Sequence, residues 1–259
     1  MRHAINFMLA ISLAACGSGE EALPGTSAEG TVHEASTYAS AVDDPARPEA
    51  DREREATRKP AELLAFAQID AGEKIGDYIM GGGYMTRLLA HAVGEEGRIY
   101  AFQPEEFIAF RPDYAAEQDT AVAGYANVTP LRAPVTAPGF PEPLDTIVTV
   151  MNFHDLYIPQ MPADTSVRAI AALHGALKPG GTLVVVDHSA AEGSGTQTTD
   201  ATHRIDRQTV IDDLTAAGFT LEAESDLYSR PEDNRDLNVF EPAMRGQTDQ
   251  FALRLRKAG

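Results

Sequence analysis

The sequence contains a single cysteine, Cys16, and no tryptophan. With one cysteine the chain cannot form an internal disulfide, which an oxidising compartment would otherwise favour. Basic residues are also scarce, since 21 Lys and Arg stand against 39 Asp and Glu for a formal net charge of −18. Such an acidic chain repels phosphate backbones, which argues against nucleic acid as a partner. No apolar run is long enough to cross a bilayer as a helix.

A short apolar segment does follow the basic start Met1-Arg2-His3. It covers residues 4–15, and this length of about a dozen residues is typical of a signal-peptide core. The segment ends at Leu13-Ala14-Ala15-Cys16, which resembles a bacterial lipobox. We therefore predict a signal peptide over residues 1–15 and lipidation of Cys16. The protein would then be a periplasm-facing lipoprotein of the cell envelope, attached to the membrane only through this anchor. An ordinary cleaved signal with an incidental cysteine is the alternative.

The composition changes again after the cysteine. Residues 16–42 are rich in Gly, Ser, Ala, Thr and Glu without apolar periodicity, and we predict a flexible tether there. Residues 43–259 form the predicted folded domain, which is long enough to bury a substantial core. A helix is expected to begin at Pro60.

From residue 72 onward, short apolar strands alternate with amphipathic helices. The predicted strands cover residues 74–79, 98–102, 127–132, 144–151, 182–187, 219–225 and 250–256. The predicted helices between them cover residues 84–93, 167–177 and 206–217. This alternation predicts an α/β fold, a Rossmann-like doubly wound and mostly parallel sheet of about seven strands. The C-terminal strand is expected to be antiparallel, because a long loop without a helix leads into it.

Two motifs resemble the class I S-adenosylmethionine-dependent methyltransferases. One is the glycine-rich turn of residues 77–83 after the first strand, and the other is the LKPGGTLVVVD run of residues 177–187. Further stretches resemble a bacterial family of predicted methyltransferases, many of them exported. They are GGGYMTRLL at 81–89, NFHD at 152–155, HRID at 203–206 and RGQTDQF at 245–251. The resemblance implies S-adenosylmethionine as the cofactor and methyl transfer to a small-molecule acceptor.

The same resemblance implies a set of cofactor-binding residues at the carboxyl ends of the strands, where ligands of such sheets bind. These residues are Asp77, Gly81, Gly83, Gln103 and Asn152. The chain departs from the family pattern at two positions. Ile79 replaces the first glycine of the loop, and Gln103 replaces the acidic residue that takes the ribose hydroxyls. A glutamine can still form a hydrogen bond there, although a charged acceptor forms a stronger one.

The predicted catalytic residues are His154 and Asp155, which directly follow the apolar strand 144–151. The pair resembles the His-Asp pair of some small-molecule O-methyltransferases. A histidine titrates near neutral pH, so His154 suits the role of general base.

Two alternatives remain open from the sequence. An exported metal-dependent hydrolase would use a cluster of His154, Asp155, Asp187, His188 and His203 as metal ligands, and it would need no cytoplasmic cofactor. A non-catalytic binding module on a degenerate methyltransferase fold is the other, and the replacements at Ile79 and Gln103 favour it. Two motifs also have structural interpretations: Asp206 is a candidate N-cap, and residues 245–251 a turn into the last strand.

Overall fold

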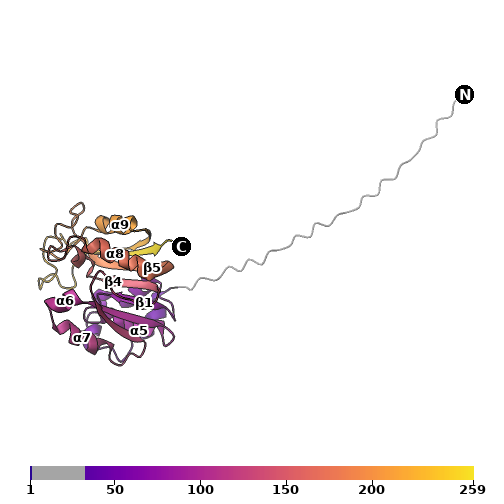
Figure 1. Cartoon of the computed structure of the whole chain (residues 1–259), viewed down its shortest axis with the longest axis horizontal. Helices are drawn as coiled ribbons and strands as arrows, with labels where there is room; N and C mark the ends of the chain where they lie inside the picture. The colour runs from indigo at the N-terminus through magenta and orange to yellow at the C-terminus, as the bar shows by residue number, and fades with distance from the viewer. Residues whose placement is uncertain (2–32) are drawn as a thin grey trace. The chain divides into compact units, whose positions relative to one another are not determined.

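The computed structural model describes Met1 and residues 33–259 (Figure 1). The predicted signal peptide, Cys16 and most of the predicted tether lie outside the described residues. No helix in the described part of the chain is both long and apolar enough to cross a membrane.

A seven-stranded sheet of order β3-β2-β1-β4-β5-β7-β6 forms the centre of the domain. Only β7 runs antiparallel to its neighbours, and the other adjacent pairs are parallel. The order reverses between β1 and β4, which creates the switch point where doubly wound sheets bind ligands. The strands are β1 (Lys74–Tyr78), β2 (Arg98–Pro104), β3 (Val128–Ala133), β4 (Leu144–Val150), β5 (Leu177–His188), β6 (Phe219–Ser225) and β7 (Gln250–Lys257). The predicted Rossmann-like fold with an antiparallel C-terminal strand is confirmed.

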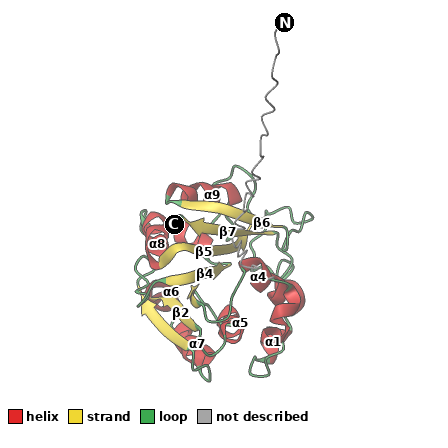
Figure 2. Ribbon diagram, turned by 90° about the vertical axis from the view of Figure 1, so that its right-hand side faces the viewer, coloured by secondary structure: helices red, strands yellow, loops and turns green. Residues whose placement is uncertain are grey.

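Helices cover both faces of the sheet, as the view in Figure 2 shows with α8 on one side and α4 and α5 on the other. Alternate residues of the buried strands supply the two cores: Ile147 of β4 packs into one, and Val148 into the other. The helices are η1 (Ala35–Tyr38), α1 (Ala39–Val42), α2 (Glu49–Arg52), α3 (Glu55–Arg58), α4 (Pro60–Ala67), α5 (Tyr84–Val93), α6 (Glu105–Phe110), α7 (Asp113–Val122), η2 (Phe153–Tyr157), α8 (Thr165–Ala176) and α9 (Arg207–Ala216).

The folded domain begins earlier than the predicted boundary at residue 43. Residues 35–42 are helical, and both Tyr38 and Ala41 are buried in the core on the α5 side of the sheet. The Tyr38 hydroxyl donates a hydrogen bond to the Ile69 carbonyl at 2.8 Å. The prediction of a tether over residues 33–42 is therefore wrong. These two short helical turns contain one buried residue each, which is too few to produce a recognisable helical pattern of apolar residues in the sequence.

The LKPGG segment belongs to β5 rather than to a turn that precedes it. The register pairs Leu144 with Leu177 and then Thr146 with Thr182, so residues 178–181 form an irregularity inside the strand. Gly181 has no room for a side chain, since a Cβ there would lie 3.0 Å from the Asp145 carbonyl oxygen. The helices α6 and α7, between β2 and β3, were not predicted.

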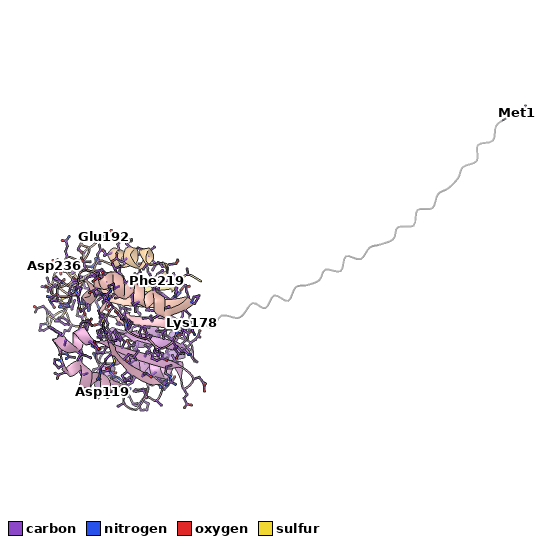
Figure 3. All side chains as sticks on the ribbon, viewed as in Figure 1. Met1, Asp119, Lys178, Glu192, Phe219 and Asp236 are labelled. Atoms are coloured by element: carbon purple, nitrogen blue, oxygen red, sulfur yellow. The ribbon has the colours of Figure 1, made fainter. Side chains whose placement is uncertain are left out.

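Two long loops meet the carboxyl edge of the sheet. Residues 189–206 follow β5 and residues 226–249 follow β6, which runs in the same direction as β5. Figure 3 shows Lys178, near the start of β5, and Asp236, in the second loop, at opposite sides of the domain. The loops therefore lie at the edge where the strand ends gather the predicted site residues.

Candidate active site at the carboxyl edge of the sheet

The glycine-rich turn between β1 and α5 contains glycines of two kinds. At Gly81 and at Gly82, no heavy atom beyond the adjacent residues of the chain lies within 4 Å of the position that a Cβ would occupy. At Gly83, which precedes α5, a Cβ would lie 2.4 Å from the Ala121 Cβ, and φ is +79°. Gly83 is therefore required by backbone conformation and packing, whereas Gly81 leaves open space beside the backbone.

Gln103 at the end of β2 contacts this turn. Its side chain is fully buried, and its Oε1 accepts a hydrogen bond from the Gly81 N–H at 3.1 Å. The Nε2 of the same amide is also buried but has no hydrogen-bond partner. An unpaired buried donor costs free energy, about 1–3 kcal/mol, unless a further group satisfies it. Gln103 thus contains an unpaired, buried donor in the same side chain that bonds to Gly81.

Asp77 lies near the carboxyl end of the central strand β1 and is buried. It accepts a hydrogen bond from the Thr86 hydroxyl. Burial raises the pKa of Asp77 to about 6, although the Thr86 hydrogen bond and the charge of Arg87 act in the opposite direction. Arg87 is itself paired with Asp51 at 2.7 Å. The Asp77 carboxylate would therefore gain from a cationic ligand group.

Asn152 and Ile79 together fix the turn. The Asn152 amide donates hydrogen bonds to the carbonyls of Ile79 at 3.0 Å and Val150 at 2.8 Å, so both of its protons bind protein. Ile79 has φ 63° and packs into the α8-side core, only 2% exposed. A β-branched residue in this region is strained, as expected where the family pattern has glycine. Asn152 positions the loop in this structure.

His154 and Asp187 form the most closely coupled pair of the site. The Asp187 carboxylate is fully buried and accepts from the His154 backbone N–H at 2.7 Å and from its ring Nδ1 at 2.8 Å. A carboxylate only accepts hydrogen bonds, so Nδ1 carries a proton and the lone pair of the neutral ring is on Nε2. Burial alone would lower the pKa of His154, but the charge and hydrogen bond of Asp187 outweigh it and raise the pKa.

The Nε2 of His154 is within hydrogen-bond distance of His203 and also faces Asp155, both of them predicted site residues. It lies 3.2 Å from the His203 Nδ1 and 3.4 Å from an Asp155 carboxylate oxygen, and the latter two atoms are 3.8 Å apart. His154 and Asp155 belong to η2 and His203 to the loop before α9, so the fold brings together residues 49 positions apart. The structure thus places the predicted catalytic pair in one cluster with His203.

His188 is not part of this cluster, which corrects the wider ligand set proposed from the sequence. Its Nδ1 bonds to the Thr248 hydroxyl at 2.9 Å, and its ring centroid is 6.2 Å from that of His154. Burial lowers the pKa of His188 to about 3, so it is neutral at physiological pH. Asp187 also differs from its predicted role as a ligand, since it bonds to the ring nitrogen of His154 that faces away from the cluster.

Arg204 is a buried charge whose role the sequence did not reveal. Its guanidinium is fully buried and pairs with Asp233 at 2.8 Å. It also donates to the carbonyls of Ser189 at 3.1 Å and Leu237 at 3.0 Å. Arg204 therefore connects the β5–α9 and β6–β7 loops directly behind His203. The neighbouring Asp206 caps α9 as predicted, by accepting from the Gln208 N–H.

Comparison with known proteins identifies the fold. No protein-family model matches the chain, and no curated protein matches it significantly. Solved structures do match. A SAM-dependent methyltransferase from Aquifex aeolicus is 20% identical, with 86% of this chain and 98% of that chain covered and a TM-score of 0.55. The N-methyltransferase NodS from Bradyrhizobium japonicum WM9 is 15% identical, with 80% and 97% covered and a TM-score of 0.53.

A third match is the [4+2]-cyclase SpnF, which is 18% identical, with 78% of this chain and 81% of that chain covered and a TM-score of 0.53. The chain therefore has the fold of the class I SAM-dependent methyltransferases, as its motifs predicted. Proteins of this fold are named for more than one reaction, so function must be argued from the site.

Proposed function

We propose that the protein transfers a methyl group from S-adenosylmethionine to a small-molecule acceptor, with His154 as general base. The observation that carries the proposal is the buried, unpartnered Nε2 of Gln103 beside the open backbone at Gly81. This is the position at which the fold binds its ligands, outside the switch point between β1 and β4.

The residues at this position fit the cofactor chemically. Gln103 would donate its free N–H to a ribose hydroxyl, which would satisfy the orphan donor. The buried Asp77 carboxylate would hold the ammonium of the cofactor's amino-acid part, either directly or through neighbouring groups. Gly81 and Gly82 would let the ligand approach the backbone without a side chain in the way. When bound, the cofactor supplies an electrophilic methyl group.

His154 supports the proton-transfer half of the reaction. Its Nε2 lone pair would take the proton of an acceptor hydroxyl or amine as the acceptor attacks the methyl group. The Asp187 carboxylate at Nδ1 would stabilise the imidazolium that forms. The Asp155 carboxylate, 3.4 Å from Nε2, would interact with the proton that Nε2 has taken from the acceptor.

The cofactor proposal is tested by calorimetry with S-adenosylmethionine and S-adenosylhomocysteine. We expect binding to the wild-type chain, and an affinity about tenfold weaker in Gln103→Ala because one hydrogen bond is lost. Gln160→Ala is the matched control, since Gln160 is exposed and bonds only to Asp200. Absence of heat with either compound would overturn the proposal.

We also propose that the chain is a lipoprotein of the cell envelope, anchored at Cys16 and facing the periplasm. The apolar run and the lipobox-like sequence support this location. Incorporation of a labelled fatty acid should be seen in the wild-type chain and lost in Cys16→Ser. The net charge of −18 favours a small molecule over nucleic acid as the acceptor.

A further inference from the structure

We propose that His154, Asp155 and His203 bind a divalent first-row transition-metal ion, with Asp187 as the outer partner that orients His154. The site uses residues proposed above for proton transfer, but metal binding there does not depend on methyl transfer. Four independent features of the structure support the site: the spacing of the three ligand atoms, their chemistry, the orientation of His154 and the anchoring of His203.

The three ligand atoms form a triangle of the right size. The distances are 3.2 Å between His154 Nε2 and His203 Nδ1, 3.4 Å from Nε2 to the Asp155 oxygen and 3.8 Å between the last two. A point inside this triangle lies about 2.0 Å from all three atoms, which is the usual length of a zinc bond to imidazole nitrogen or carboxylate oxygen. The three atoms are thus close enough together to be ligands of one ion.

The donor set indicates which ions fit. Two imidazole nitrogens and one carboxylate oxygen suit zinc, iron and related ions, whereas magnesium and calcium prefer oxygen ligands throughout. Three protein ligands also leave coordination positions for water or substrate, as in catalytic rather than structural sites.

His154 is oriented as metal-ligating histidines usually are. Its Nδ1 donates to the buried Asp187 carboxylate at 2.8 Å, which fixes the tautomer with the lone pair on Nε2. Asp187 is itself held by the backbone N–H groups of His154 and His188, both at 2.7 Å. This second layer keeps the ring from rotating out of the cluster.

His203 is held in place at a backbone conformation that costs energy. Its φ is 54°, and its ring packs on Phe240 at a centroid distance of 4.7 Å. On its C-terminal side, the Arg204–Asp233 pair ties the chain to the β6–β7 loop, and the Ile205 N–H bond to the His188 carbonyl at 3.0 Å fixes it to the end of β5. Left-handed conformations of residues other than glycine are energetically unfavourable and concentrate at functional sites.

The ion and the general-base role exclude each other at any one moment, because Nε2 has a single lone pair. In the metal-loaded state, the ion would lower the pKa of a coordinated hydroxyl or water and take over its activation. Metal binding would therefore change how the acceptor is activated.

The test uses the full chain, purified in mild detergent and stripped of metal with EDTA. We expect Zn²⁺ to bind with a stoichiometry of one ion per chain by calorimetry and to raise the melting temperature, and Mg²⁺ to do neither. Asp155→Asn and His203→Ala should weaken Zn²⁺ binding by more than the ~10- to 100-fold that loss of an outer partner costs. His188→Asn keeps a group that can bond to Thr248 and should leave Zn²⁺ affinity unchanged.

Three results would overturn the site: no Zn²⁺ binding, undiminished binding in both Asp155→Asn and His203→Ala, or equal weakening in His188→Asn. Asp155 is partly exposed, so its variant is expected to fold even if His203→Ala does not. Titration of the same samples with S-adenosylhomocysteine separates the metal proposal from the cofactor proposal. Binding of this compound is expected to depend on Gln103 and Gly81 rather than on the cluster of His154, Asp155 and His203.

Discussion

Asp187 accepts hydrogen bonds from both the backbone N–H and the ring Nδ1 of His154, at 2.7 and 2.8 Å. One carboxylate thus sets the position of the η2 backbone and the tautomer of its histidine. Both proposed activities of His154, proton acceptance and metal ligation, require this tautomer, because both use the lone pair on Nε2.

Asp187→Asn tests the orienting role. The amide of an asparagine can donate to Nδ1, which would favour the tautomer with the proton on Nε2 and remove the lone pair from the cluster. We expect Zn²⁺ affinity to fall by about 10- to 100-fold. Calorimetry well below the melting temperature of the variant separates this effect from lost stability. Unchanged affinity in a folded variant would show that Asp187 serves only to hold the loop.

Alanine substitutions along residues 81–83 separate packing from ligand access. Gly83→Ala should lower the free energy of unfolding by about 3 kcal/mol or more, because its Cβ would collide with Ala121 at a strained φ. Gly82→Ala, with open space and an ordinary φ, should change it by less than ~0.5 kcal/mol.

Gly81→Ala is expected to reduce stability more than Gly82→Ala and less than Gly83→Ala. Its φ of +55° costs about 1–2 kcal/mol, but the side chain meets no protein atom. We expect a modest loss of stability with a large loss of S-adenosylhomocysteine affinity. Urea unfolding together with calorimetry measures both quantities. Equal affinity in Gly81→Ala and the wild type would place the ligand elsewhere.

Much of the fold was predictable because buried parallel strands produce apolar runs of characteristic length. β4 and the second half of β5 are such runs, and both were located closely. The irregular start of β5 was not, since Lys178 to Gly181 read as a turn although they continue the strand. Likewise, Tyr38 is buried by contacts with α4, and the pattern of apolar residues around Tyr38 in the sequence does not indicate those contacts.

The site was predictable where it depends on neighbours in sequence, as for His154, which follows shortly after the end of β4. Successive strand residues point to opposite faces, so Asp187 and His188 could not both reach His154 by side chain. The position of His203 depends on Arg204, whose partner Asp233 lies 29 residues further along the chain. Only the folded loops show that connection.

Ile79→Gly sets two effects against each other. Relief of the positive φ should gain about 1–2 kcal/mol. Loss of a buried isoleucine side chain, 2% exposed, should cost about 2–5 kcal/mol. We therefore expect a net decrease in the free energy of unfolding, measured in urea, with little change in S-adenosylhomocysteine affinity. A stabilised variant would mean that strain outweighs packing at this position.

The raised pKa of Glu73 makes the stability of the protein depend on pH. Burial, aided by the charges of Asp145 and Asp70, raises its pKa from 4.5 to about 7. Below pH 4.5 the Glu73 carboxyl is protonated in both the folded and the unfolded state, so its burial carries no electrostatic penalty to stability. As the pH rises from 4.5 to 7 the unfolded state ionises first, so stability falls, and above pH 7 the penalty is constant.

Glu73→Gln should remove this dependence, with a gain of about 1–2 kcal/mol at pH 8 after allowance for partial solvent screening, and none at pH 4. Glu222→Gln is the opposite control, since Arg256 and Arg254 outweigh desolvation and lower the pKa of Glu222. Loss of the Glu222 charge in this variant should slightly reduce the free energy of unfolding at neutral pH. Thermal melts of both variants from pH 4 to 8 make the comparison, and parallel curves for Glu73→Gln and wild type would contradict a raised pKa at Glu73.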